Sequence, residues 1–105
     1  MLIPCLASVS QIDAQGNSLT GVDLSIVANS TSLSYLYFQN NKLTAASLDT
    51  MIATLNSGIN STGLGSQLTF DFSGTGNAFI TNPTTQNYIT DLRDNYSCTI
   101  NVNGF

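Results

Sequence analysis

The chain has 105 residues, enough for one domain with a modest hydrophobic core. Two basic residues stand against six acidic ones, a formal net charge of −4, which excludes nucleic acid as a partner because neutralising phosphates requires clustered Lys and Arg. The hydrophobic content of 42% excludes compositional disorder, and no apolar run reaches the roughly 18 residues of a membrane span.

Residues 1–8 precede the first predicted strand and are expected to form an N-terminal cap or arm. They lack the basic leader and the long apolar run of a secretory signal. Their apolar side chains either cover the first coil of the fold or insert into a neighbouring subunit, because terminal coils expose apolar flanks. No capping motif of charged residues marks either terminus. The candidate assembly residues are Leu2, Ile3, Leu6 and Phe105.

The next part of the chain repeats itself. An apolar pattern that ends on asparagine recurs after 24 residues, and a repeat of this period predicts a solenoid of short coils. Alternate side chains of each strand face inward before the asparagine turns the chain. We predict strands over 11–15 and 35–39, the first returning through an irregular segment or a single helical turn. The repeated residues are Val9, Ile12, Ala14, Asn17 and Leu19, followed by Leu33, Leu36, Phe38, Asn41 and Leu43.

The second return segment has the pattern of a helix. Thr44 is a good N-cap, the apolar residues of 45–57 recur at helical spacing, and Gly58 provides a stop before a loop over 60–66. The apolar stripe consists of Leu48, Ile52 and Leu55, with Met51 beside it.

A third strand is predicted over 68–72, where Phe70 and Phe72 take the places of Leu36 and Phe38. The turn that follows places Thr75 where the asparagine of the repeat would align. The sequence therefore predicts that the ladder of asparagines is interrupted in this coil.

A second helix and a last strand complete the chain. Asn82 caps a helix that begins at Pro83 and ends near Asn95, with a buried stripe of Tyr88, Ile89 and Leu92. The strand over 98–102 buries Ile100 and Val102. These elements predict four parallel strands joined by right-handed crossovers, in a single domain whose coils span 9–32, 33–66, 67–96 and 97–105.

Two of these segments carry a resemblance to a known family. Asn41 to Thr44 open a helix, and Phe72 to Gly74 place a serine-glycine turn after the next strand. This resembles the leucine-rich-repeat-like module of bacterial surface proteins and phage tail or virion proteins, with Tyr96 where that module has tryptophan. The resemblance implies an α/β fold: a short solenoid of about four parallel strands on the concave side, with irregular and then helical convex segments.

The same resemblance implies a function. It points to a non-enzymatic binding or display module, most simply a phage virion protein, either a capsid decoration or a tail-associated protein, that contacts the bacterial surface. The implied partners are other virion or surface proteins and cell-surface glycan, with the chain as a homo-oligomer or assembly subunit. Two alternatives remain open: a structural subunit or cap without an external ligand, and a fragment of an adhesin at the bacterial surface or outside the cell.

The candidate binding residues lie between the buried ones, on the concave face of the sheet. Two tyrosines among amides, hydroxyls and carboxylates are suited to stacking on sugar rings or peptide side chains; the alternative is an ordinary solvated sheet. We predict a central row of Asp13, Tyr37, Asp71 and Asn101, a second row of Gln11, Tyr35, Thr69 and Thr99, and a third of Gln15, Gln39, Ser73 and Asn103.

Neither a catalytic, a metal nor a cofactor site is predicted. Asp13 and Asp71 are a carboxylate pair of the kind that hydrolyses glycosides, but they lie two strands apart without apolar neighbours. Histidine is absent, so zinc lacks a ligand set. Cys5 and Cys98 lie near opposite ends of the stack, too far apart for a disulfide, and are expected to be reduced thiols.

Overall fold

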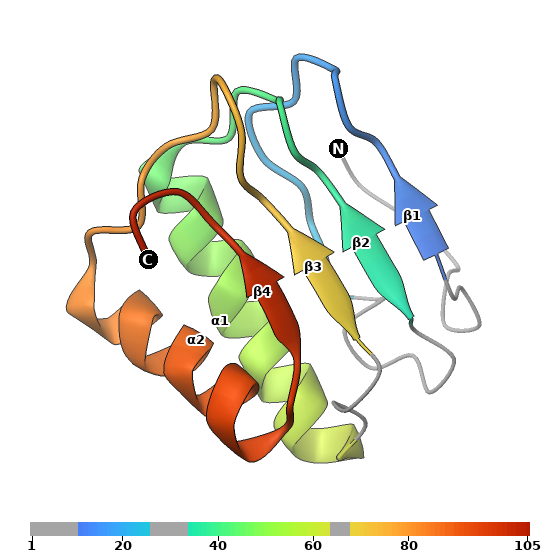
Figure 1. Ribbon diagram of the computed structural model, residues 1–105, viewed down its shortest axis with the longest axis vertical. Helices are drawn as coiled ribbons and strands as arrows, with labels where there is room; N and C mark the ends of the chain where they lie inside the picture. Colours follow the sequence, from blue (N-terminus) through green and yellow to red (C-terminus); the bar gives the residue numbers. More distant parts are fainter. Residues whose placement is uncertain (1–10, 26–33, 64–67) are drawn as a thin grey trace.

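Four short parallel strands form the sheet of this protein (Figure 1). The computed structural model describes residues 11–25, 34–63 and 68–105. The strands are hydrogen-bonded in sequence order, β1-β2-β3-β4. The elements in chain order are β1 (Gln11–Asp13), β2 (Tyr35–Tyr37), α1 (Ala45–Thr62), β3 (Thr69–Asp71), α2 (Pro83–Asn95) and β4 (Thr99–Asn101).

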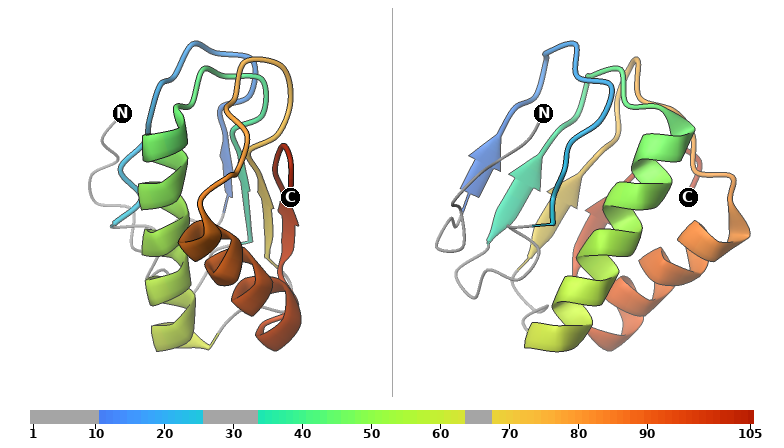
Figure 2. Two further views of the ribbon diagram at one scale, coloured as in Figure 1. Left: turned by 90° about the vertical axis from the view of Figure 1, so that its left-hand side faces the viewer. Right: turned by 180° about the vertical axis from the view of Figure 1, so that it is seen from behind.

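The fold has two layers. Both helices lie on one face of the sheet, as the edge-on view shows, and the opposite face carries neither of them (Figure 2). The first return segment brings Val22 and Leu24 onto the helical side, where both are buried, and its described part is irregular. The predicted α/β class and the order of four parallel strands are confirmed.

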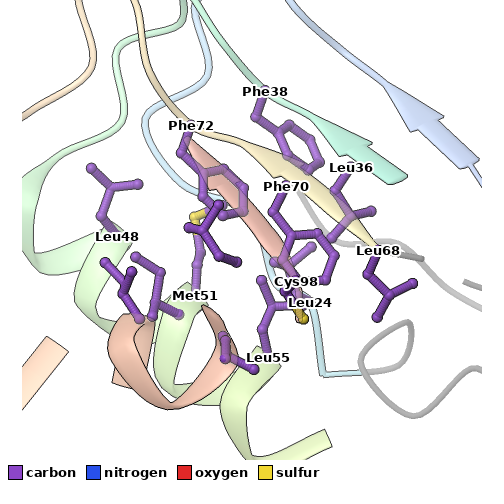
Figure 3. Packing of buried hydrophobic residues seen from close by; sticks show 14 of the residues in the cluster. Leu24, Leu36, Phe38, Leu48, Met51, Leu55, Leu68, Phe70, Phe72 and Cys98 are labelled. Atoms are coloured by element: carbon purple, nitrogen blue, oxygen red, sulfur yellow. The ribbon is translucent and has the colours of Figure 1, made fainter. Parts of the chain in front are cut away.

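The inward side chains form one column across the sheet. The predicted register is confirmed: Leu36 pairs with Ile12 on one side and with Phe70 on the other, and Phe70 pairs with Ile100. Leu36 and Phe70 are fully buried, and α1 packs its own apolar stripe against them (Figure 3).

The strands are shorter than predicted, but their pairing continues beyond the ends. Ala14 N–H donates to the Tyr37 carbonyl at 2.8 Å, and Phe38 N–H donates to the Asp71 carbonyl at the same distance. The chain therefore stays in register until it reaches a left-handed residue. That residue occupies the same position in every coil: Gly16 (φ 71°), Asn40 (φ 58°), Gly74 (φ 93°) and Gly104 (φ 81°).

Buried asparagines bind each turn to the preceding coil. Asn41 accepts a hydrogen bond from Leu19 N–H at 3.1 Å and donates to the Ala14 carbonyl at 3.0 Å. Asn77 repeats this one coil later, accepting from Leu43 N–H at 3.0 Å and donating to the Phe38 carbonyl at 3.0 Å.

The prediction that the asparagine ladder breaks at Thr75 is therefore wrong. The turn of the third coil is two residues longer than that of the second, so Asn77 rather than Thr75 reaches the ladder position. Gly76, at φ 103°, takes up the extra length, and a Cβ at Gly76 would collide with the Asn41 carbonyl oxygen.

Helix α1 begins as predicted and ends later. The Thr44 side chain accepts from Ser47 N–H, which confirms the N-cap. The predicted stop at Gly58 is wrong, because Gly58 is buried within the helix and Ile59 extends the apolar stripe by another turn. The helix ends at Gly63, whose left-handed backbone donates to the Ile59 carbonyl, so the predicted loop begins after residue 62.

Helix α2 matches its prediction. Asn82 is the N-cap and accepts from Thr84 N–H, Pro83 is the first helical residue, and the helix ends at Asn95. Ile89 and Leu92 are buried, whereas Tyr88 is only half-buried. Neither α1 nor α2 combines the length and the apolar character that crossing a membrane would require.

Candidate binding face of the sheet

The face of the sheet opposite the helices (Figure 2) is here called the open face. The alternation of buried and more exposed residues along the strands places the outward side chains of all four strands on it. The strand register places the first two predicted rows side by side, as expected. The open face comprises Gln11, Asp13, Gln15, Tyr35, Tyr37, Gln39, Thr69, Asp71, Ser73, Thr99 and Asn101.

Two stacked tyrosines occupy the centre of the open face. The ring centroids of Tyr35 and Tyr37 lie 4.3 Å apart, with their planes at 19° to each other. The Tyr35 hydroxyl donates to Gln11 Oε1 at 2.9 Å, which ties the ring to β1. Both tyrosines are half-buried. The pair is thus a fixed aromatic platform rather than two independent side chains.

A chain of amides runs beside the tyrosines. Gln39 Nε2 donates to Gln15 Oε1 at 2.7 Å, and Gln15 Nε2 donates to Asp13 Oδ2 at 3.3 Å. Among the described residues Gln39 Oε1 has no hydrogen-bond donor, although the atom is buried. A buried acceptor without a donor costs free energy, so a donor that reaches Gln39 Oε1, through rearrangement or from a ligand, would stabilise this site.

The two carboxylates of the open face lie on either side of β2. Asp13 and Asp71 pair with opposite sides of Tyr37, so a whole strand separates them. Asp71 is held by its own turn, accepting from Ser73 N–H at 3.0 Å and from Ser73 Oγ at 2.6 Å. Each carboxylate therefore accepts hydrogen bonds from its own coil, Asp13 from Gln15 and Asp71 from Ser73.

The third predicted row ends one residue early. Asn103 does not lie on the open face, because its side chain turns back into the preceding coil. It accepts from Gly74 N–H at 3.1 Å and donates to the carbonyls of Gly74 and Asn77. Asn103 therefore holds the turn of the third coil instead of joining the surface row, and its bonds differ from those of Asn41 and Asn77.

A polar network that was not predicted from the sequence joins the two helices. Asp91 of α2 accepts hydrogen bonds from Asn56, Asn60 and Asn95, at 2.7, 3.0 and 2.6 Å. The bonds from Asn95, Asn60 and Asn56, in that order of effect, lower the pKa of the Asp91 carboxyl. The spacing of Asn56 and Asn60, one helical turn apart, was the available signal.

A second carboxylate lies at the other end of the helix pair. Asp49 of α1 accepts from Thr85 Oγ1 at 2.7 Å and from Asn82 Nδ2 at 3.3 Å. It borders a shallow groove of about 630 Å³ between α1 and α2, lined mainly by Ser and Thr side chains. These contacts fasten the N-terminus of α2 to α1, which gives Asp49 a structural role.

The C-terminal end of the sheet is capped by a charge, contrary to the sequence analysis. Arg93 Nη2 donates to the Ile100 carbonyl at 2.6 Å, and Nη1 donates to the Phe105 carbonyl at 3.0 Å. The guanidinium also lies 5.5 Å from the centroid of the Phe105 ring. Phe105 therefore rests on its own chain. The other candidate assembly residues, Leu2, Ile3 and Leu6, lie outside the described residues.

Cys98 is a free, buried thiol, as expected. Burial, with a smaller effect from the Asp91 charge, raises its pKa to about 11. Cys5 lies outside the described residues. Within the described residues the acidic and thiol side chains do not gather in a group of three that would hold a metal ion.

In comparisons with known proteins, no protein-family model, curated protein or solved structure matches this chain.

Proposed function

We propose that the chain is a leucine-rich-repeat-like solenoid that acts as a non-enzymatic binding module, and that its open face binds uncharged glycan. Two observations support the solenoid. The left-handed turn residue recurs in all four coils, and Asn41 and Asn77 make equivalent bonds to the coil before them. Repetition of the same turn and the same buried amide is the mark of stacked coils.

The stacked pair of Tyr35 and Tyr37 carries the binding proposal. Each ring covers one face of the other, so their edges and outer faces remain for a ligand. Sugar rings pack their C–H faces on aromatic rings and use their hydroxyls on the polar groups around them. Amides, hydroxyls and a carboxylate surround this pair, among them Gln39, Thr69 and Asp71.

The charge of the open face selects the kind of glycan. Asp13 and Asp71 lie on it, whereas Lys42 and Arg93 belong to none of its rows. Binding phosphate, sulfate or carboxylate groups calls for Arg or Lys. Neutral sugars are therefore favoured over anionic polymers.

The setting that fits this module best is a phage particle on which it contacts the bacterial surface as a decoration or tail-associated protein. The support is the sequence resemblance at 41–44 and 72–74, together with a surface made of Asn, Ser and Thr rather than charges. A bacterial adhesin is the alternative source. The position of the gene, beside capsid or tail genes or within a longer reading frame, decides between them.

A glycan screen with paired variants tests the proposed ligand. We expect binding to neutral but not to anionic glycans, and we expect Tyr35→Ala/Tyr37→Ala to lose about 2 kcal/mol of binding free energy, roughly 30-fold in Kd. Tyr88→Ala, which removes a half-buried tyrosine of α2, is the matched control and should bind normally. Unchanged binding by the folded double variant would refute the proposal.

A second candidate is a structural subunit without an external ligand. It is favoured by the way the polar groups of the open face bond to one another: Tyr35 to Gln11, Gln39 to Gln15, and Asp71 to Ser73. Apart from Gln39 Oε1, the polar groups in these pairs have partners within the protein and do not require a ligand. Failure of the wild-type protein to bind any glycan or bacterial cell in the same screen supports this candidate.

A further inference from the structure

On the open face, side chains that lie opposite each other on β1 and β2 bond directly. The Tyr35 hydroxyl donates to Gln11 Oε1 at 2.9 Å, and Gln39 Nε2 donates to Gln15 Oε1 at 2.7 Å. Tyr35 and Gln11 are in-register neighbours of the sheet, so the Tyr35 ring reaches toward β1. The polar side chains of this half of the open face are therefore engaged with one another.

The corresponding side chains of β3 and β4 do not bond to each other. Asp71 and Asn101 are in-register neighbours on these strands, which run about 4.8 Å apart. Asp71 uses Oδ1 to accept from Ser73. Within the described part of the chain, Asp71 Oδ2 and the side-chain amide of Asn101 make no hydrogen bond. An acceptor and a donor thus lie side by side without a bond between them.

A sugar hydroxyl has the chemistry that fits this pair, because it donates one hydrogen bond and accepts another. It would donate to Asp71 Oδ2, a charge-assisted and therefore strong bond, and accept from Asn101 Nδ2. An ionised phosphate or carboxylate has no proton to donate to Asp71. An ammonium group would satisfy Asp71 but would leave the Asn101 amide without an acceptor. The pair therefore selects an uncharged hydroxyl.

Tyr37 supplies the apolar part of the same site. It is the in-register neighbour of Asp71 on the side away from Asn101, so the three residues follow one another across β2, β3 and β4. A sugar ring that packs its C–H face on Tyr37 is then about one strand spacing from Asp71. On the other side of Tyr37, Asp13 lies beside the tyrosine rather than beside an amide.

We propose that Asp71 and Asn101 hold one free hydroxyl group of a neutral sugar between them while the sugar ring packs on Tyr37. The bound glycan then lies over β2, β3 and β4 rather than over β1. This inference rests on the glycan-binding function proposed above. It adds that the glycan carries an unsubstituted hydroxyl at this position, and that Asp71 takes part in binding whereas Asp13 does not.

A carboxylate placed at residue 101 tests the required order of donor and acceptor. The probes are dextran, mannan and galactan, three neutral polysaccharides, each with and without O-methylation, and binding is measured by biolayer interferometry. We expect Asn101→Asp to weaken binding about tenfold, because two carboxylates leave the hydroxyl without a donor. O-methylation should weaken wild-type binding by a similar factor, since a methyl ether has no proton for Asp71. Asp13→Asn is the matched control and should bind like the wild type.

Exchanging the two residues separates their hydrogen-bonding role from a structural one. Asp71→Asn/Asn101→Asp keeps one acceptor, one donor and the net charge, and Oδ1 of the new amide can still accept from Ser73 N–H. We expect the double variant to bind within about threefold of the wild type although Asn101→Asp alone does not. Circular dichroism checks that each variant is folded.

The outcomes distinguish this inference from the function on which it rests. Loss of binding by Tyr35→Ala/Tyr37→Ala, with normal binding by Asn101→Asp and normal binding of the O-methylated probes, overturns the inference and leaves glycan binding intact. An Asp13→Asn variant that loses as much as Asn101→Asp also overturns it, because the glycan then lies over β1. Binding of oligolysine in place of the polysaccharides would assign Asp71 to a basic peptide. A wild type that binds none of the polysaccharides contradicts both the inference and the proposed function.

Discussion

Replacing the buried Asn77 by alanine tests the asparagine ladder most directly. The side chain is 5% exposed and makes four hydrogen bonds: it accepts from Leu43 N–H and donates to the carbonyls of Phe38, Phe72 and Ser73. These bonds join the third coil to the second as well as fixing its own turn. Alanine removes all of them and leaves the Leu43 N–H buried.

The cost follows from the groups left without partners. An unpaired buried donor costs about 1–3 kcal/mol, and the carbonyls that lose their donor add to this. A water in the vacated space recovers part of the loss. We therefore expect Asn77→Ala to lower the free energy of unfolding by about 3 kcal/mol, a large share of the roughly 5–15 kcal/mol of a small domain.

The matched control is Asn17→Ala. Asn17 occupies the ladder position of the first coil but is exposed, and within the described part of the chain it donates to the carbonyls of Ala14 and Gln15 alone. Its loss should cost less than about 1 kcal/mol, since water replaces the amide. The assay is urea unfolding followed by circular dichroism. Equal effects of the two substitutions, or an Asn77→Ala effect below about 0.5 kcal/mol, would contradict the inferred role of the ladder.

Three further predictions rest on single contacts. Gly76→Ala should lower the free energy of unfolding in urea by about 3 kcal/mol, because both the φ of 103° and the Asn41 carbonyl oxygen oppose a Cβ at this position. Gly16→Ala, which has open space around the new Cβ, should lower it by about 1 kcal/mol. Similar losses for the two variants would refute this prediction. Cys98, with its pKa raised from 9.0 to about 11, should carry about 100-fold less thiolate at pH 8 than an ordinary cysteine. Its reaction with Ellman's reagent should be slower by the same factor, and fast labelling of the folded protein would contradict the burial of the thiol. Because the Asp91 pKa is lowered below its usual 3.8, its contribution to stability is present above that pH and lost as the pH falls below it; Asp91→Asn should flatten this acid limb in thermal unfolding, and an unchanged limb would assign it to other groups.

Local patterns in the sequence were enough to predict most of the elements. Alternation with a period of two located all four strands and set Ile12, Leu36, Phe70 and Ile100 in one column, since this period follows from the geometry of an extended chain. The helix starts at Thr44 and Asn82 were equally accessible, because capping involves only adjacent residues.

The errors concern features that depend on distant parts of the chain. Thr75 was assigned to the ladder position because the coils were aligned without gaps. Such an alignment cannot account for a third turn that is two residues longer than the second. Gly58 was taken as a helix stop, although the core it faces outweighs the cost of glycine within a helix. Arg93 gave no local signal of capping, since its partners, Ile100 and Phe105, lie beyond the helix that carries it.

The candidate site shows the same division. Its rows were predictable, because strand register alone decides which outward residues become neighbours. The stacking of Tyr35 on Tyr37 and the amide chain from Gln39 to Asp13 depend on side-chain rotamers, which the sequence pattern leaves undetermined. The part of the site that gives it chemical selectivity was therefore visible only in the structure.

The two faces of the sheet have different capacities for interaction. On the helical side, the carboxylates Asp49 and Asp91 are already bound by side chains of the same helices, so a partner there would have to displace internal bonds. On the open face, the Tyr35–Tyr37 pair remains partly uncovered. The tyrosine pair is therefore the more accessible place for the proposed glycan.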